Sequence, residues 1–173
     1  MVESSFLMEA GRLRPSSIEV SMHVPHRVAV LMALLILCSG SLAQQKTLNA
    51  ERELFNAVNR ERKAQGLPSL MLDDALTEAA RKHAERMAER RTVSHQLPGE
   101  PTLPSRAKAA GAHFTWLSEN VDEGPDASAI HQSFMKSPQH RANILDSDMD
   151  SVGIGVAENN GQLFAVEDFS KAK

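Results

Sequence analysis

The sequence contains one cysteine, Cys38, in 173 residues. A single cysteine excludes an intrachain disulfide framework and a zinc site built from several thiolates. Cys38 also precedes the segment that we expect to fold, so the folded part has no cysteine nucleophile. Its stability must come from packing and hydrogen bonds.

Aromatic residues are scarce as well: the chain has one tryptophan, six phenylalanines and no tyrosine. Such a chain has few aromatic side chains with which to line a large apolar groove. Basic residues show no excess either, because the formal net charge is −3. This balance lacks the electrostatic footprint of a nucleic-acid-binding protein and does not favour binding to anionic membranes.

Three catalytic motifs are missing from the sequence. It has no Gly-x-Ser-x-Gly nucleophile elbow, no glycine-rich phosphate loop and no His-Glu-x-x-His metal motif. Ser94 and His95 are neighbours in the sequence, but adjacency alone does not make a nucleophile and its base. The sequence therefore gives no support for a serine hydrolase or a nucleotide-binding protein.

Long apolar runs are absent too, since the main one covers only residues 28–37. A membrane-spanning helix needs roughly 20 apolar residues. Arg27 precedes the run, and the small residues Ser41 and Ala43 follow it. This order is typical of a secretory signal cleaved after Ala43. We therefore expect a secreted protein, extracellular or periplasmic, with no transmembrane segment after cleavage.

The predicted signal peptide covers residues 22–43. Because Met22 would begin a signal of ordinary length, we interpret residues 1–21 as a mis-assigned start or an extended N-terminal region. Lipidation of Cys38 is an alternative, but Leu37 stands where lipoprotein signals carry a small residue. We therefore favour cleavage over lipidation.

The remaining residues, 44–173, fit one domain with a single core. Apolar periodicity and capping residues predict helices over residues 47–65, 73–91, 105–110 and 126–135, and another from residue 137. The segment 112–121 is too sparse in apolar residues for an assignment. A hairpin is predicted where the tight-turn pair Asn160 and Gly161 separates two strands, at residues 151–157 and 163–169.

This hairpin register places Ile154 opposite Glu167. Gly153 and Gly155 leave one face of the first strand bare, which lets a helix or a ligand approach the backbone closely. Helices and antiparallel strands that occupy separate parts of the chain predict the α+β fold class.

The run that begins at Ser137 is the most informative motif. Ser137 is a good N-cap, and Pro138 suits the first helical position, where no N–H is needed. His140 then lies in the first turn of the helix. The positive end of the helix dipole disfavours an imidazolium there and keeps a lone pair available for a metal or a proton.

Three pieces of the chain carry a family resemblance: Ser94-His95, Glu119-Asn120 and the run from Ser137. In their order and spacing they resemble the bacterial branch of the CAP superfamily, the cysteine-rich secretory protein, antigen 5 and pathogenesis-related 1 domain, also called the SCP domain. The resemblance covers residues 47–170. It implies a three-layer α-β-α sandwich.

In that family, two histidines and two acidic residues line a central cleft. The resemblance implies that His95 and His140 are the two histidines and that Glu119 is the first acid. Such a set could hold Zn²⁺ or a related divalent metal with an open position. The second acid does not carry over, because Lys136 or Ser137 falls at its place.

Four residues are candidate replacements for the missing acid: Glu123, His131, Glu167 and Asp168. We take Glu167 as the candidate fourth ligand, because related chains often carry a glutamine in this strand. His83 is interpreted as a packed, hydrogen-bonded core residue. His113 and His131 are expected to be solvated polar residues.

The sequence leaves three functions open. The first is a non-enzymatic module that binds an unknown ligand outside the cell or in its envelope, which the missing acid and nucleophile favour. The second is a metal-dependent peptidase or esterase, in which His95 and His140 hold zinc and Glu119 ligates it or acts as the base. The third is lipid or sterol binding, as in some relatives. We expect a monomer.

Overall fold

The computed structural model describes residues 26–172, with side chains from residue 42 onward. The predicted start at Met22 lies outside the described residues. The chain divides into two compact units, and the second, which begins at Leu37, contains the sheet and the helices that cover it. No helix in the described part is both long and apolar enough to cross a membrane.

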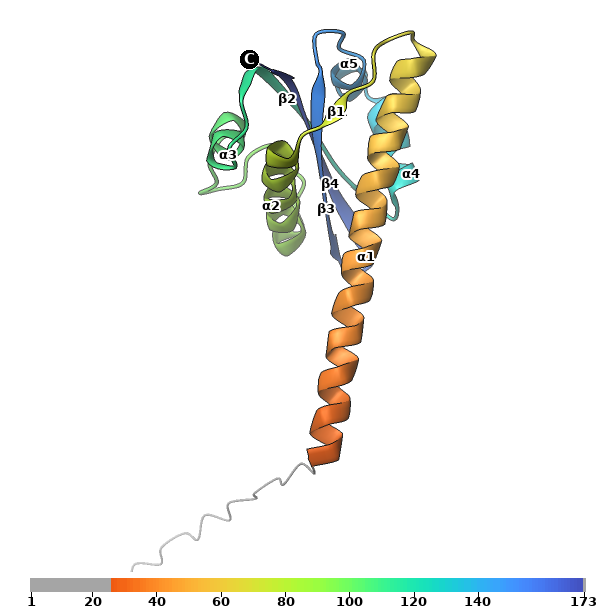
Figure 1. Cartoon of the computed structure of the whole chain (residues 1–173), viewed down its shortest axis with the longest axis vertical. Coiled ribbons are helices and arrows are strands. Elements are labelled where there is room, and N and C mark those ends of the chain that lie inside the picture. The colour runs from red at the N-terminus through yellow and green to blue at the C-terminus, as the bar shows by residue number, and fades with distance from the viewer. Residues whose placement is uncertain (1–25, 173) are drawn as a thin grey trace, which may run out of the picture. The chain divides into compact units, whose positions relative to one another are not determined.

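A four-stranded sheet lies at the centre of this unit, in the order β1-β3-β4-β2 (Figure 1). Its strands are β1 Met71–Leu72, β2 Phe114–Gly124, β3 Ser151–Asn159 and β4 Gln162–Ala172. The short β1 pairs with β3 in parallel, and the other neighbours are antiparallel. The long strand β2 is therefore an edge strand.

The predicted hairpin is confirmed. Strands β3 and β4 are joined by Asn160 and Gly161, which both adopt positive φ angles, 53° and 86°. Two left-handed residues in succession give the backbone twist that a two-residue hairpin requires. The register places Ile154 opposite Glu167, as predicted.

The helices begin and end close to the predicted capping residues, with one exception at the N-terminus. They are α1 His26–Ala64, α2 Asp74–Arg90, α3 Leu103–Ala109, α4 Ala127–Lys136 and α5 Pro138–Ile144. The side chains of Asp73 and Asp126 each accept a backbone hydrogen bond of 2.8 Å at the start of α2 and α4. The hydroxyl of Ser137 accepts from the N–H of His140 at 3.5 Å, so the predicted cap of α5 is confirmed.

Helices α2 and α3 lie on one face of the sheet, and α2 approaches β3 closely (Figure 1). A Cβ atom at Gly155 would lie 2.2 Å from the carbonyl carbon of Ala80, and one at Gly153 would lie 2.2 Å from that of Leu76. Only glycine permits this distance, because real Cβ contacts are much longer. The predicted close approach at these glycines is confirmed.

The second face of the sheet is covered by α1, α4 and α5. The main core lies there and includes Leu54, Val58, Ile130, Phe134, Ile144 and Phe169. Two helical layers with a sheet between them form the expected three-layer α-β-α sandwich of the α+β class. Its core is mainly aliphatic, in keeping with the few aromatic residues of the chain.

Two parts of the fold differ from the prediction. Helix α1 begins at His26, well before residue 47, and the intervening residues are mainly good helix formers such as leucine and alanine. The unassigned segment 112–121 lies largely in β2. This strand pairs with β4 along nearly its whole length, so tertiary pairing decides a conformation that local apolar spacing does not.

Candidate polar site

The site is built around two consecutive residues of the edge strand β2, Glu119 and Asn120. Because side chains alternate along a strand, they point to opposite faces of the sheet. Glu119 meets Arg106 of α3 on one side, and the Asn120 amide donates to the carbonyl of His140 on the other, at 3.1 Å. Both side chains are buried. The motif therefore joins both helical layers at the sheet edge.

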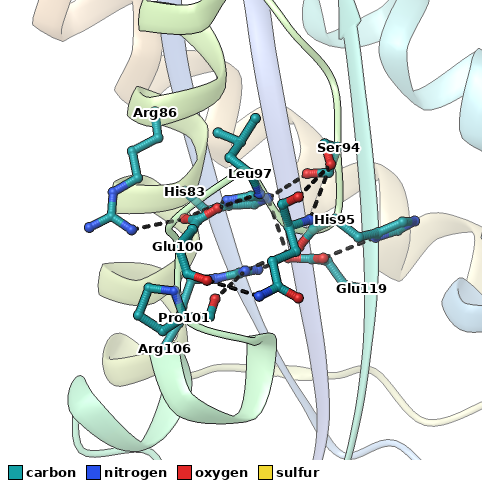
Figure 2. A network of polar contacts seen from close by, with 10 residues as sticks. His83, Arg86, Ser94, His95, Leu97, Glu100, Pro101, Arg106 and Glu119 are labelled. Atoms are coloured by element: carbon teal, nitrogen blue, oxygen red, sulfur yellow. Dashed lines mark hydrogen bonds and ion pairs between the residues drawn. The ribbon is translucent and has the colours of Figure 1, made fainter.

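Both carboxylate oxygens of Glu119 have partners (Figure 2). Oε1 lies 3.0 Å from Nδ1 of His95, and Oε2 accepts from the Arg106 guanidinium. The sequence-predicted pair His95 and Glu119 is thus brought into direct contact. The carboxylate, however, also has a cationic partner that the motif did not indicate.

Arg106 is the residue that sequence reasoning missed. Its side chain is buried, and its Nη1 donates to the carbonyls of His95 and Pro101 at 3.1 and 3.3 Å, while Nη2 binds Glu119. It therefore fixes the loop that carries His95. In the sequence, Arg106 is marked only by its position in the predicted short helix at residues 105–110. That position does not distinguish it from the other basic residues of the chain.

A second buried pair, formed by His83 and Glu100, lies beside the loop that carries His95 (Figure 2). Nε2 of His83 donates to the carbonyl of Ser94 at 2.8 Å, and Nδ1 lies 2.9 Å from the carboxylate of Glu100. Burial acts to raise the pKa of Glu100, but the N–H of Leu97 and the contact with His83 outweigh it, so the pKa is lowered. The prediction that His83 is a packed, hydrogen-bonded core residue is confirmed.

His95 lies on a loop, as predicted, and its side chain is 61% exposed. The hydrogen bond with Glu119 raises the pKa of His95, and this effect exceeds the opposing effects of partial burial and of Arg106. Since Nδ1 faces Glu119, Nε2 is the ring atom left for a ligand. Glu119 thus fixes the orientation of the His95 ring, and the rest of the ring is accessible to solvent.

His140 lies within the range of the His95 charge but forms no hydrogen bond with His95 or Glu119. Its ring packs edge-on against Phe134, at 5.2 Å between centroids, and its Nδ1 is buried without a hydrogen-bond partner. Burial lowers the pKa of His140; Asp122 opposes this effect and the charge of His95 adds to it. The pKa values of the two histidines are therefore shifted in opposite directions, upward for His95 and downward for His140.

Glu167 belongs to the opposite side of the sheet from Glu119. It is fully buried, and its Oε2 accepts from the Asn120 amide at 3.0 Å, while Oε1 has no partner. Burial raises the pKa of Glu167 to about 8. Asn143 of α5 donates to the Asn120 side-chain oxygen at 2.8 Å. Glu167 thus supports the strand and α5 rather than joining the side chains of His95 and Glu119.

The neighbouring residue, Asp168, is the acid that lies on the side of Glu119. The two are paired across β4 and β2, and Asp168 is fully buried with no hydrogen-bond donor to either oxygen. Burial raises the pKa of Asp168, the charge of Glu119 raises it further, and Arg106 only partly offsets this. A proton on Asp168 would convert a repulsive contact into a hydrogen bond with Glu119.

The remaining candidates lie apart from this site. Glu123 and His113 are exposed, so the prediction for His113 is confirmed. The prediction that His131 is solvated is wrong: its exposure is 9%, and its Nε2 lies 3.6 Å from the carboxylate of Glu61. His131 faces α1 because α4 packs against that helix, and burial lowers its pKa.

The side-chain arrangement does not fit the expected zinc site. Both carboxylate oxygens of Glu119 already have partners, and a zinc ion bound to either would lie beside the positively charged guanidinium of Arg106, which repels it. Within the described part of the chain, no three His, Cys, Asp or Glu side chains converge as a metal ion requires. We therefore derive no chemistry that passes through a metal.

A three-layer sandwich with two histidines beside an edge-strand Glu-Asn motif defines the class of the protein. The chain belongs to the cysteine-rich secretory protein family, the CAP family, whose model matches residues 55–169. It is similar to an uncharacterized Bacillus subtilis protein, YkwD, with 28% identity over 110 residues, which cover 63% of this chain and 43% of that one. An uncharacterized Borreliella burgdorferi protein is 26% identical over 100 residues, 58% of this chain and 64% of its own length. The chain therefore spans less than two thirds of either relative.

Solved structures agree with this assignment. An extracellular Bacillus anthracis protein containing an SCP domain superposes with a TM-score of 0.70 at 25% identity, covering 75% of this chain and 42% of that one. An outer surface protein of Borrelia burgdorferi has the same fold, with a TM-score of 0.67 at 24% identity, over 72% of this chain and 94% of its own. Similar proteins thus include extracellular and surface proteins.

Proposed function

We propose that the protein is a secreted, non-enzymatic CAP module that binds a ligand at the polar site formed by His95, Glu119 and His140. One observation carries the proposal: both oxygens of Glu119 are engaged, one by His95 and one by Arg106. A carboxylate that is neutralised by a buried arginine is a weak general base and a poor metal ligand. The role left to the Glu119 carboxylate is to orient the ring of His95.

The chemistry of His95 indicates the kind of group that the site would bind. Glu119 binds Nδ1 and raises the pKa of the ring, so His95 stays an imidazolium, with a proton on the exposed Nε2 as well as on Nδ1, to a higher pH than an isolated histidine. A protonated Nε2 donates a hydrogen bond. The ligand would therefore present an acceptor, such as a carboxylate or a carbonyl oxygen.

Secretion is part of the same proposal, and two observations support it. The apolar run at residues 28–37 resembles a signal peptide, and similar structures include an extracellular and an outer-surface protein. A module outside the cell would meet its ligand or partner there. The metal-dependent hydrolase receives no support from the engaged carboxylate.

The test is an NMR titration of the full chain with the sodium salt of N-acetylglycine, which carries both a carboxylate and an amide carbonyl. We expect saturable shifts of the His95 ring resonances, weakened at least about tenfold in a His95→Gln variant. His113→Gln, at an exposed histidine away from the site, is the matched control. The absence of saturable shifts at His95 would refute binding at this location.

A second titration tests the non-enzymatic part of the proposal. We expect calorimetry with zinc chloride to give no stoichiometric binding that depends on His95 and His140, and p-nitrophenyl acetate to show no turnover restored by zinc. Micromolar zinc binding that is lost in a His95→Ala/His140→Ala variant would contradict the proposal and restore the hydrolase.

A further inference from the structure

The only tryptophan of the chain, Trp116, is exposed on the edge strand β2, with 63% of its surface accessible. Exposure is unusual for an indole ring, which supplies more apolar area than any other side chain. Trp116 pairs with Lys171 of β4 next to a shift in the strand register. The ring therefore lies beside a charged side chain at one end of the sheet.

A cavity of about 550 Å³ opens beside this ring. Its lining combines one aromatic residue with polar and charged ones: Thr115, Trp116, Asp146, Asp148 and Lys171. Asp146 and Asp148 come from the loop between α5 and β3, so three elements contribute to the cavity. None of the polar-site residues His95, Glu119 and His140 belongs to this lining.

The loop that carries the two aspartates is held in place by a buried arginine. Arg62 of α1 is fully buried, and its guanidinium donates to the carbonyls of Ile144, Asp146 and Met149 at 2.9, 2.8 and 3.2 Å. The N–H of Asp148 donates to the side chain of Asp146 at 2.9 Å. Because these bonds order the loop in advance, a ligand would bind without the cost of ordering it.

The charges around the cavity are balanced. The carboxylates of Asp146 and Asp148 are offset by Lys171, which lies 3.8 Å from Asp148, and by Arg62 behind the loop. A strongly charged ligand would meet a like charge on one side, whereas a neutral ligand would find both donors and acceptors. An indole face next to such groups suits a ring with an apolar face and hydroxyls around its edge.

We propose that this cavity is a saccharide-binding site, in which a neutral pyranose ring stacks on Trp116 and its hydroxyls bind Asp146, Asp148 and Lys171. The site is separate from the polar site around His95. The module would therefore have two binding surfaces, and the failure of one proposal leaves the other intact.

The test uses the fluorescence of Trp116, which reports on the cavity without interference because it is the only tryptophan. The full chain is titrated with chitotriose, cellotriose and maltotriose, each to about 20 mM, which covers weak dissociation constants. We expect a saturable change with at least one of them. Asp146→Asn and Asp148→Asn should each weaken that binding at least about tenfold. Glu123→Gln, which changes an exposed acid on β2, the strand of Trp116, should leave the binding unchanged.

Further measurements separate stacking from a general effect on the fluorophore. Trp116→Ala should abolish the line broadening that the protein causes in the NMR spectrum of the bound sugar, and His95→Ala should preserve it. The proposal is overturned if no trisaccharide gives saturation, if binding survives in both aspartate variants, or if choline chloride binds in place of the sugars.

Discussion

Arg106 and Glu119 form a buried ion pair at the point where α3 meets the edge strand β2. Arg106 also donates to the carbonyl of His95, so one guanidinium neutralises the carboxylate of Glu119 and fixes the loop that carries His95. This pair explains why a site that resembles a metal centre in its sequence has a different electrostatic character in the folded chain.

Replacing Arg106 by glutamine should destabilise the protein strongly. Removal of one partner of a buried ion pair leaves an uncompensated charge and typically costs about 3–5 kcal/mol. The free energy of unfolding would be measured by urea denaturation. Arg106→Gln/Glu119→Gln should recover part of the loss, because the second change removes the unpaired charge. Lys108→Gln, at an exposed position of α3, is the control; an equal loss there would contradict this role.

Replacing Glu167 by glutamine should stabilise the protein at neutral and alkaline pH. The carboxyl has a pKa of about 8 in the folded state, above its ordinary value near 4.3 in an unfolded chain. The folded state therefore binds the extra proton, and stability falls as the pH rises from about 4 to 8. Glutamine can still accept from Asn120 without carrying a charge.

The expected signature is the pH dependence of the difference between the two proteins. Glu167→Gln and the wild type should be similar near pH 4, and the variant should be more stable by roughly 2–4 kcal/mol at pH 8. Urea denaturation at a series of pH values measures this, with the exposed Glu123→Gln as a matched control. A constant difference across this range would show that Glu167 is not protonated in the folded state.

The two site histidines should titrate on opposite sides of the ordinary histidine pKa. His95 has a raised pKa because of its hydrogen bond with Glu119, and His140 has a lowered pKa because of burial. NMR titration of the ring protons measures both values in one sample. Glu119→Gln should lower the pKa of His95, since it removes the carboxylate charge. A pKa of His95 that does not change would exclude this contact in solution.

The same shift gives His95 a small effect on stability. Its raised pKa means that the contribution is fully present below the unfolded-state pKa of about 6.5 and is lost as the pH rises through the folded-state value. The side chain is 61% exposed, so solvent screening limits the contribution to less than about 1 kcal/mol. The effect should be absent in His95→Gln.

Local signals in the sequence were sufficient for the hairpin and for the helix starts at residues 73, 126 and 137, because these features depend on residues that are close together in the chain. That His95 and Glu119 belong to one site was implied by the family resemblance, and their direct contact was seen only in the structure. The roles of Arg106 and Asp168 could not be predicted, because they depend on which residues of distant segments are buried together. His131 shows the same limit: its polar side chain gave no sign that α4 would bury it against α1.

Replacing Gly155 by alanine should separate α2 from the sheet. The added Cβ would lie 2.2 Å from the backbone of Ala80, and a helix backbone cannot move without disturbing its packing. Overpacking of this kind typically costs about 1–3 kcal/mol or more. Thermal or urea unfolding measures the loss. Gly124→Ala is the comparison variant, because its Cβ would meet the Cγ1 atom of the buried Ile130 side chain at 2.8 Å rather than a helix backbone. The longer distance leaves a smaller overlap to relieve, so Gly124→Ala should lose less stability than Gly155→Ala; equal losses would show that the α2 contact at Gly155 is not the tight one.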